Sequence, residues 1–535
     1  MEVSILKQPN GVFVETDSGW VKMVYDPFSG WSQGDIHVSM ELEESKRAMK
    51  IFLEANRSAI HQIRFHWMHD LKMPVILLGD HWERAYGDMK WSGLEPERVL
   101  PWYGLMNDGE STYGFGVKTG PSAMCHWHVD SSGFTMYADV SCGSQGVQLG
   151  ERKLEVAVLV DMHSELELSP FMAAQAFCKI MCERPLMPSY PVYGGNNWYY
   201  AYGNSTHDKI LEDSRFISEL AGTVENRPFM VIDDCWQLGS GVSGNGGPWI
   251  GNRDFPDMKC LADEMKEIGV KPGIWCRPLL THEKVPESWI RYTKEGHFLD
   301  PSLPEVLAYV ASFIGRMHDW GYELIKHDFS TFDIFGQWGF EMGSKVNQLP
   351  YSFADRSRTS AEIITELYRT IAKASKDSLI IGCNTIGHLA AGIFEIQRTG
   401  DDTSGKSWER TRRMGINTLA FRMPQHGTFF SHDADCVGIT SAIPWEYNKQ
   451  WLDVLSNSGT PLFVSADSTQ LSIEQREALK EAFQIASQPI PVAEPLDWMF
   501  NTCPSRWKIA DEIKQYDWSK RNEIPLHDQE NPWWL

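Results

Sequence analysis

Short apolar segments alternate with amphipathic segments along the chain from Val192 to Asp467. The apolar segments have the length of strands buried on both faces, and the amphipathic ones carry apolar residues at helical spacing, as Leu261, Met265 and Ile268 do. Eight such units can be counted, which is typical of an α/β fold with a (β/α)8 TIM barrel. The predicted strands are Val192–Tyr200, Phe229–Trp236, Lys271–Pro278, Glu323–Ser330, Leu379–Thr385, Glu395–Asp402, Thr428–Val437 and Thr460–Asp467.

Residues 1–168 have a different pattern, in which short alternating strands follow one another without helices between them. The segment Gly11 to Tyr25 alternates apolar and polar residues around Asp17-Ser18-Gly19, which indicates a β-hairpin. Repeated strands of this kind predict an N-terminal β-sandwich domain. We expect a helical linker over residues 169–191, the barrel over 192–488, and a short C-terminal tail, β or irregular, over 489–535.

The charge and composition of the chain limit its partners. A net charge of −22 disfavours nucleic acid and anionic membranes, because an acidic surface repels both. The 22 tryptophans suit a carbohydrate, since sugar rings stack on flat indole faces. We therefore expect a carbohydrate substrate and no metal or other cofactor, and the sequence leaves a homo-oligomer open.

The N-terminal segment lacks the basic and apolar regions of a signal peptide, and no later stretch is long and apolar enough to span a bilayer. A cytoplasmic location is the expectation, although removal of a leader would leave the same appearance. Ten cysteines are scattered without C-x-x-C pairs, which favours free thiols over a disulfide framework or a zinc site.

Acidic residues gather at the ends of three predicted strands, and in a barrel such ends meet at one rim. The groups are Asp233 and Asp234, then Lys326 and Asp328, and finally Arg398, Asp401 and Asp402. Burying several like charges is costly unless a ligand or cations compensate them, so a purely structural origin is disfavoured. Lys326 and Asp328 share a strand face. We expect the ammonium to keep Asp328 ionised as a nucleophile, while a second acid holds a proton at rest.

The stretches around these acids resemble clan D glycoside hydrolases, the α-galactosidases of families 27 and 36, and family 36 most closely. The matching stretches are I-D-D-C-W (232–236), G-I-W-C-R-P (273–278), I-K-H-D-F (325–329), I-G-C-N-T (381–385) and R-T-G-D-D-T (398–403). A β-sandwich before the barrel is also similar to family 36, so the resemblance covers about residues 1–488. It implies a retaining hydrolase that releases terminal α-linked galactose from oligosaccharides or glycoconjugates through a glycosyl-aspartate intermediate.

The resemblance also implies roles for individual residues. Asp328 matches the nucleophile of the family, and Asp402 matches the acid/base, because it follows Arg398 by four positions. Asp401 leaves this assignment ambiguous by one residue. Further positions match the substrate-binding residues of the family: Asp233 and Asp234 for O4 and O6 of galactose, with Lys326, Trp275, Cys383 and Arg398.

Two residues depart from the family pattern, His327 beside the nucleophile and Asn384 where small residues are common. They leave open whether the substrate is an α-galactoside or, as in α-N-acetylgalactosaminidases, carries an N-acetyl group at the 2-position. A related α-glycosidase, or a sugar-binding homologue with weak catalysis, also stays open.

Aromatic residues outside these motifs are further candidates for sugar binding. The loop Gly79–Trp91 is rich in aromatic and charged residues, and Trp82 or Trp91 either packs at the surface or leans over a sugar. Trp198 follows Gly194-Gly195-Asn196-Asn197, where a phosphate loop would need a following Lys-Ser or Lys-Thr that is missing. We expect Trp198 to face the sugar.

Two other kinds of site compete with the glycosidase hypothesis. His432, Asp433 and Asp435 could form a metal cluster, but no second group at ligand spacing accompanies them, so a hydrogen-bond network at the rim is favoured. Lys326 could form a Schiff base as in an aldolase, but the surrounding aspartates would keep it protonated and unreactive.

Overall fold

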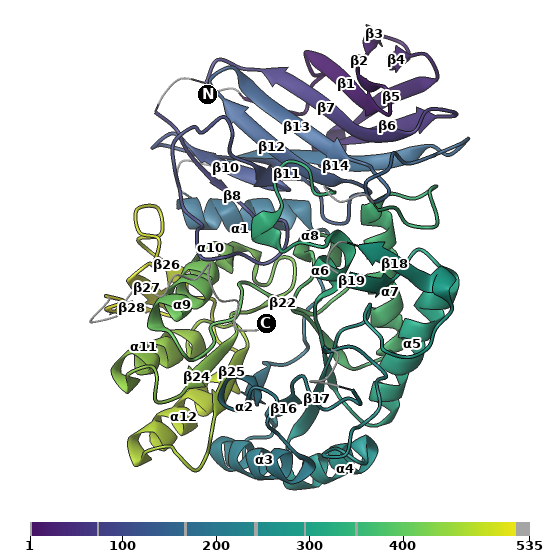
Figure 1. Ribbon diagram of the computed structural model, residues 1–535. Coiled ribbons are helices and arrows are strands. Elements are labelled where there is room, and N and C mark those ends of the chain that lie inside the picture. Colours follow the sequence, from purple (N-terminus) through teal and green to yellow (C-terminus); the bar gives the residue numbers. More distant parts are fainter. Residues whose placement is uncertain are drawn as a thin grey trace.

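The computed structural model describes residues 3–71, 74–164, 168–239, 244–293, 296–347 and 351–519. Two antiparallel sheets near the N-terminus lie on one side of a curled parallel sheet that is surrounded by helices (Figure 1). The expected α/β fold with β-structure before a parallel sheet is confirmed at this level. Among the helices of the described segments, none has the length and apolar character needed to cross a bilayer.

The N-terminal part contains an antiparallel sheet of six strands in the order β2-β1-β7-β13-β12-β9 and another of eight strands in the order β3-β4-β5-β6-β14-β11-β10-β8. The strands of the first sheet are β1 (Gly11–Thr16), β2 (Gly19–Lys22), β7 (Ile60–Met68), β9 (Leu100–Pro101), β12 (Met124–Asp130) and β13 (Gly133–Asp139). Those of the second are β3 (Val24–Asp26), β4 (Gly30–Gln33), β5 (Ile36–Glu43), β6 (Ala48–Ala55), β8 (Ile76–Gly79), β10 (Tyr103–Asn107), β11 (Thr112–Val117) and β14 (Leu154–His163).

Large aromatic side chains fill the space between these two sheets. Phe115 of β11 contacts Trp127 of β12 and Phe134 of β13, with ring centroids 5.4 and 4.9 Å apart. All three rings are fully buried, and burial of such apolar area is the main favourable term holding two sheets together. The predicted hairpin is present, with β1 and β2 paired from Phe13–Lys22 to Thr16–Gly19.

A parallel sheet of nine strands forms the centre of the second part, in the order β23-β22-β21-β20-β17-β16-β15-β25-β24. Its strands are β15 (Tyr193–Asn196), β16 (Phe229–Ile232), β17 (Lys271–Cys276), β20 (Leu324–His327), β21 (Leu379–Gly382), β22 (Ile396–Arg398), β23 (Ser431–Asp433), β24 (Cys436–Ile439) and β25 (Leu462–Ala466). Each is shorter than predicted, because the residues at the predicted ends leave the ladder to form loops or, after β15 and β20, short helices.

The two edge strands of the parallel sheet are consecutive in the chain. β23 pairs with β22 and β24 pairs with β25, and only Ala434 and Asp435 separate them. The prediction of one strand from Thr428 to Val437 was therefore wrong. Asp435 has a φ of 70°, which a regular strand cannot contain, so the extended chain is interrupted there.

Helices lie between the strands on the outside of the parallel sheet (Figure 1). They are α2 (Trp198–Ala201), α3 (His207–Ala221), α4 (Met258–Ile268), α5 (Pro304–Asp319), α6 (Ser330–Phe335), α7 (Ser360–Ala374), α8 (Gly387–Ala390), α9 (Trp408–Arg410), α10 (Thr418–Arg422), α11 (Trp445–Ser456) and α12 (Ile473–Ala486). Capping boxes begin α7 at Thr359 and α12 at Ser472, where each hydroxyl accepts a backbone N–H three residues on. Helical spacing of apolar residues in the sequence predicts helices over His207–Ala221, Met258–Ile268 and Ile473–Ala486, and the bounds of α3, α4 and α12 agree with these ranges.

Smaller elements complete the chain. α1 (Pro170–Met181) lies between the antiparallel sheets and the rest, and β18 (Ile290–Thr293) forms a hairpin with β19 (Gly296–Leu299). A three-stranded antiparallel sheet follows α12, made of β26 (Glu494–Pro495), β27 (Arg506–Ile509) and β28 (Glu512–Gln515). The sequence left this segment open between strands and an irregular tail, and the structure has strands as far as Gln515.

Candidate active site

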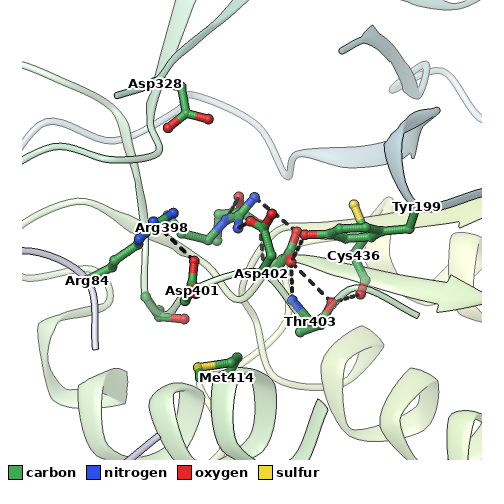
Figure 2. A network of polar contacts seen from close by, with 12 residues as sticks. Arg84, Tyr199, Asp328, Arg398, Asp401, Asp402, Thr403, Met414 and Cys436 are labelled. Atoms are coloured by element: carbon green, nitrogen blue, oxygen red, sulfur yellow. Dashed lines mark hydrogen bonds and ion pairs between the residues drawn. The ribbon is translucent and has the colours of Figure 1, made fainter. Parts of the chain in front are cut away.

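The acidic residues singled out in the sequence follow the carboxyl ends of neighbouring parallel strands. Asp233 follows β16, Asp328 follows β20, and Asp402 comes four residues after the end of β22. Figure 2 shows Asp328 apart from the network of polar contacts around Asp402 and Arg398. Asp234, Asp328 and Asp402 are partly exposed, whereas Asp233 is 3% exposed. The structure therefore brings these acids to one end of the sheet and leaves three of them open to solvent.

Asp328 is held by two N–H donors. The indole Nε1 of Trp275 donates to Oδ2 at 3.1 Å, and the backbone N–H of Phe329 donates to Oδ1 at 2.8 Å. Phe329 has a φ of 64° and turns the chain from β20 directly into α6. This turn points the carboxylate out of the sheet, because the residue after the strand cannot continue in extended geometry.

Lys326 and His327 point to opposite sides of β20. The ammonium of Lys326 lies 2.7 Å from Oδ2 of Asp233, so its direct ion pair is with Asp233 and its interaction with Asp328 is at longer range: the side chain reaches across β17 to the end of β16. Burial lowers the pKa of Lys326, but the carboxylate of Asp233 outweighs it and keeps the pKa well above its ordinary value. His327 is buried beside Tyr368 and Phe394, and burial lowers its pKa to about 3.

The two acids after β16 differ in their surroundings. Asp233 accepts from Asn196 Nδ2 at 2.7 Å as well as from Lys326. Asp234 accepts from its neighbour Cys235 N at 2.6 Å and from Gln237 Nε2 at 2.7 Å. Burial raises the pKa of Asp234 to about 6 despite these hydrogen bonds. Asp234 therefore changes charge at about pH 6.

Arg398 holds three carboxylates at once (Figure 2). Its nitrogens lie 3.0 Å from Asp402, 3.2 Å from Asp433 and 2.9 Å from Asp435. Asp435 also accepts the hydroxyl hydrogen of Tyr199. Burial raises the pKa of Asp435, and the neighbouring Asp402 adds to this effect. Of the residues expected to form a network at the rim, Asp433 and Asp435 do so with Arg398, in a buried position, whereas the ring nitrogens of His432 take no part in it.

Asp402 has a lowered pKa in this arrangement. Burial alone would raise it, but the guanidinium of Arg398, followed by that of Arg84, outweighs the effect of burial. The expectation that the acid/base holds a proton at rest is therefore not met in the ligand-free site. The side chain of Asp402 is 21% exposed, so a substrate can reach it.

Asp401 points away from Asp402 and lies between two other arginines. Arg84 Nη2 is 3.1 Å from Oδ1, and Arg410 Nη2 is 2.6 Å from Oδ2. The Asp401 side chain is only 7% exposed. Alternation along the chain thus separates the two adjacent acids, one toward the open end and the other into a buried pair of cations.

The remaining candidates lie at different depths. Trp198 begins α2 after β15 and is half-buried, tilted against Tyr202. Cys383 follows β21 and is 1% exposed. Of the two alternatives left open for Trp82, the structure shows packing and not a place over a sugar: Trp82 is 2% exposed, packs edge-to-face on Trp102, and donates its indole N–H to Gly343 O at 3.1 Å. A loop rich in aromatic residues is packed here because its rings fill the space between the two parts of the chain.

Within the described segments, no group of three or more His, Cys, Asp and Glu side chains is arranged to hold a metal ion. His432 is fully buried and does not join Asp433 and Asp435 in a common site.

Several residues of the site were not found from the sequence. They are Arg84, Asn196, Tyr199 and Arg410, which hold the acids described above. Arg84 lies in a loop already noted for its density of charge, but its partner is more than 300 positions away and nothing local indicates it.

The chain was compared with known families and structures. No family model matches it. Among solved structures, the α-galactosidase TtGalA from Thermus thermophilus, in complex with p-nitrophenyl α-D-galactopyranoside, is similar with a TM-score of 0.61 at 14% identity, over 95% of this chain and 99% of the other.

Two further similar structures come from other bacteria. The GH36 α-galactosidase AgaA from Geobacillus stearothermophilus, in complex with 1-deoxygalactonojirimycin, has a TM-score of 0.58 at 14% identity, over 89% of this chain and 75% of the other. An α-galactosidase from Lactobacillus brevis has a TM-score of 0.56 at 13% identity, over 94% and 70%. The chain therefore shares the fold of GH36 α-galactosidases.

Proposed function

We propose that this protein is a retaining glycoside hydrolase that releases terminal α-linked galactose. The observation that carries the proposal is the placement of Asp328 and Asp402, two partly exposed carboxylates beyond the carboxyl ends of β20 and β22. The fold supports it, because the similar TtGalA and AgaA are α-galactosidases. In barrels with parallel strands, catalytic groups lie at this end of the sheet.

The reaction needs two carboxyl groups about 5 to 5.5 Å apart in a retaining enzyme. Asp328 attacks the anomeric carbon while the bond to the leaving oxygen breaks, and Asp402 gives its proton to that oxygen. Water then attacks the glycosyl-aspartate, Asp402 takes the water proton, and Asp328 is released. Because the pKa of Asp402 is lowered in the free site, the protonated form that starts this cycle is a minor one at neutral pH.

The acids after β16 account for the proposed sugar. Asp233 and Asp234 offer adjacent acceptors for the O4 and O6 hydroxyls, and an epimer without the axial hydroxyl would leave a buried acceptor unpaired. Asn384, which departs from the family pattern, is fully buried, donates to Glu83 and accepts from Phe332 N at 3.1 Å. Its amide is therefore committed within the protein, which favours a galactoside over the N-acetyl sugar.

We infer that the curled parallel sheet works as a (β/α)8 barrel whose seventh strand is divided into β23 and β24. The two antiparallel sheets then form a β-sandwich domain before it. Our proposed division is residues 1–168, the linker 169–191, the barrel 192–488 and the tail 489–535.

Replacement of the nucleophile tests the proposal. We expect Asp328→Ala to lose several orders of magnitude in turnover of p-nitrophenyl α-galactoside, and azide or formate to restore part of the rate by taking the place of the carboxylate. Asp319→Ala, at an exposed aspartate that ends α5, is the matched control. Turnover by Asp328→Ala at the wild-type rate would refute the proposal.

A panel of nitrophenyl glycosides tests the sugar. Faster hydrolysis of the α-glucoside than of the α-galactoside would contradict the role of Asp233 and Asp234, and preference for the α-N-acetylgalactosaminide would change only the name of the substrate.

A further inference from the structure

A loop of the N-terminal β-structure joins the end of a strand in the parallel sheet. Ala85, in the segment between β8 and β9, forms a parallel bridge with Gly400. The backbone N–H of Ala85 donates to Thr399 O at 2.9 Å, and that of Asp401 donates to Ala85 O at 3.1 Å. The loop thus extends β22 beyond its end, next to the residues that carry the acids.

Glu83 enters the protein from this loop and is fully buried. Its carboxylate accepts from Tyr86 OH, from Gly339 N at 2.9 Å and from Asn384 Nδ2. Asn384 in turn accepts from Phe332 N in α6, which begins two residues after Asp328. Glu83 therefore contacts Asn384, which holds the start of α6, the helix that follows Asp328.

Arg84 lies next to Glu83 and reaches the other acid. It is 5% exposed, pairs with Asp401 at 3.1 Å and lies over the ring of Trp338 at 5.3 Å. Arg410 forms an ion pair with the other oxygen of the Asp401 carboxylate, and it also donates its Nε–H to the backbone oxygen of Asp402 at 2.6 Å. Removing Arg84 leaves Asp401 with one cation instead of two. Asp401 precedes Asp402 in the chain, so a shift of Asp401 also moves Asp402.

We propose that Glu83 and Arg84 are positioning residues of the active site, through which the N-terminal domain completes it. Arg84 holds Asp402 in place through Asp401, and Glu83 holds the turn after Asp328 through Asn384. The inference rests on the proposed function, and it goes further by assigning a part of the site to the other domain. Neither residue is placed to touch the substrate.

The same loop provides a matched control. Asp80 accepts from Arg422 at 2.7 and 2.9 Å and from Gln425 at 2.7 Å, and it is as buried as Arg84. Asp80 thereby ties the loop to α10. Arg422 also donates to the backbone oxygens of Glu83 and Thr399, but neither Asp80 nor Arg422 has a hydrogen bond to the side chain of Asp401 or Asn384 among the described contacts. Asp80→Asn therefore weakens the attachment of the loop and leaves the cation beside the acids in place.

The experiment compares Arg84→Met, Arg84→Lys and Asp80→Asn in the full chain. We expect Arg84→Met to lower kcat by roughly 10²-fold, since a small displacement of a reacting group has an effect of that size. The loss should be larger for a disaccharide than for a nitrophenyl galactoside, which needs little help from an acid, even though removal of Arg84 also takes away part of the lowering of the Asp402 pKa. Added guanidinium should restore part of the rate. Arg84→Lys should keep more of the rate, and Asp80→Asn should lower Tm while kcat stays near the wild-type value.

Two results would overturn the inference. If Arg84→Met keeps the wild-type kcat and the wild-type dependence on leaving group, the inference is overturned. It is also overturned if Asp80→Asn lowers kcat as much as Arg84→Met at the same loss of Tm, because the loop is then a structural support only. A wild-type chain that hydrolyses no α-galactoside would overturn the proposed function and this inference together, whereas an active one with indifferent Arg84 variants overturns only the inference.

Discussion

At the scale of single residues, the site is dominated by an imbalance of charge. Arg398 contacts three carboxylates and Lys326 contacts a fourth, so acids outnumber the cations that hold them. Such a cluster is stable only if some acids bind protons or a ligand compensates them. The opposite shifts of Asp402 and Asp435 are the result: the acid with more cations near it stays charged, and the more enclosed one is pushed toward protonation.

This imbalance predicts how activity depends on pH. In the proposed mechanism Asp402 must be protonated to assist a poor leaving group, and its pKa is lowered, so kcat/KM for a disaccharide should rise as the pH falls. Asp234 has a pKa of about 6, and in its proposed role it must be charged to accept from the sugar, so activity on a nitrophenyl galactoside should fall below that pH. We expect the disaccharide to have the lower pH optimum, measured with both substrates in the same buffers.

Variants of the adjacent acids are the control for this prediction. Asp402→Ala should remove the difference between the two pH profiles and stall deglycosylation of the nitrophenyl substrate. Asp401→Ala should lower the rates on both substrates, because Asp401 is proposed to position Asp402, but should keep the difference between the profiles. If Asp401→Ala removes it instead, the acid/base has been assigned one residue too late.

At the scale of secondary-structure elements, the interruption between β23 and β24 places a carboxylate in the network around Arg398. Asp435 can turn its carboxylate toward Arg398 because its φ of 70° takes it out of the ladder. Thr403 donates its N–H to Asp435 at 2.7 Å, and Tyr199 of α2 donates its hydroxyl. One irregular residue thereby connects the loops after β15, β22 and β23.

Removal of the tyrosine hydroxyl tests this connection. Tyr199→Phe takes a donor from a buried carboxylate, so we expect a loss of about 1–3 kcal/mol in the free energy of unfolding and a lower kcat. Tyr193→Phe is the control, because its hydroxyl donates to the neutral Asn226 O at the opposite end of β15. Denaturant unfolding and kinetics measure the two effects. An unchanged kcat in Tyr199→Phe would show that the contacts of Asp435 do not affect the reaction.

At the scale of the whole molecule, the antiparallel and parallel parts share an extensive interface. The ring of Trp102 stacks on His388 at 4.8 Å, and Ser360 at the start of α7 exchanges hydrogen bonds with Ser141 and Gly143. The ion pair between Arg152 and Glu362 adds a contact near the surface. Most of these groups are buried, so separation of the two parts would expose apolar and unpaired polar surface together.

The interface predicts that the two parts unfold together. Thermal unfolding should give one transition when it is followed by tryptophan fluorescence, by far-UV circular dichroism and by loss of activity. A chain that begins at residue 169 should fail to fold or be inactive, because it lacks Arg84 and the groups that cover α7 and α8. Two separate transitions, or full activity of the shortened chain, would contradict this expectation.

The local pattern of the sequence was sufficient for much of the fold. The bounds of α3, α4 and α12 follow from helical spacing and capping residues, and the parallel strands follow from short apolar runs. The strand ends were less predictable. The predicted segment ending at Ser330 stops at His327, because Phe329 adopts a positive φ that begins α6, and the residue type itself does not favour that conformation.

The sequence by itself determined which residue types stand after which strands, and so placed Asp233, Asp328 and Asp402 at one end of a parallel sheet. Only the tertiary structure decided what each one contacts. Lys326 pairs with Asp233 rather than with Asp328, and Arg84 reaches Asp401 from a loop of the other part of the chain. The physical reason is that hydrophobic periodicity is local and survives in any fold, whereas the partner of a charge depends on which distant segments pack beside it.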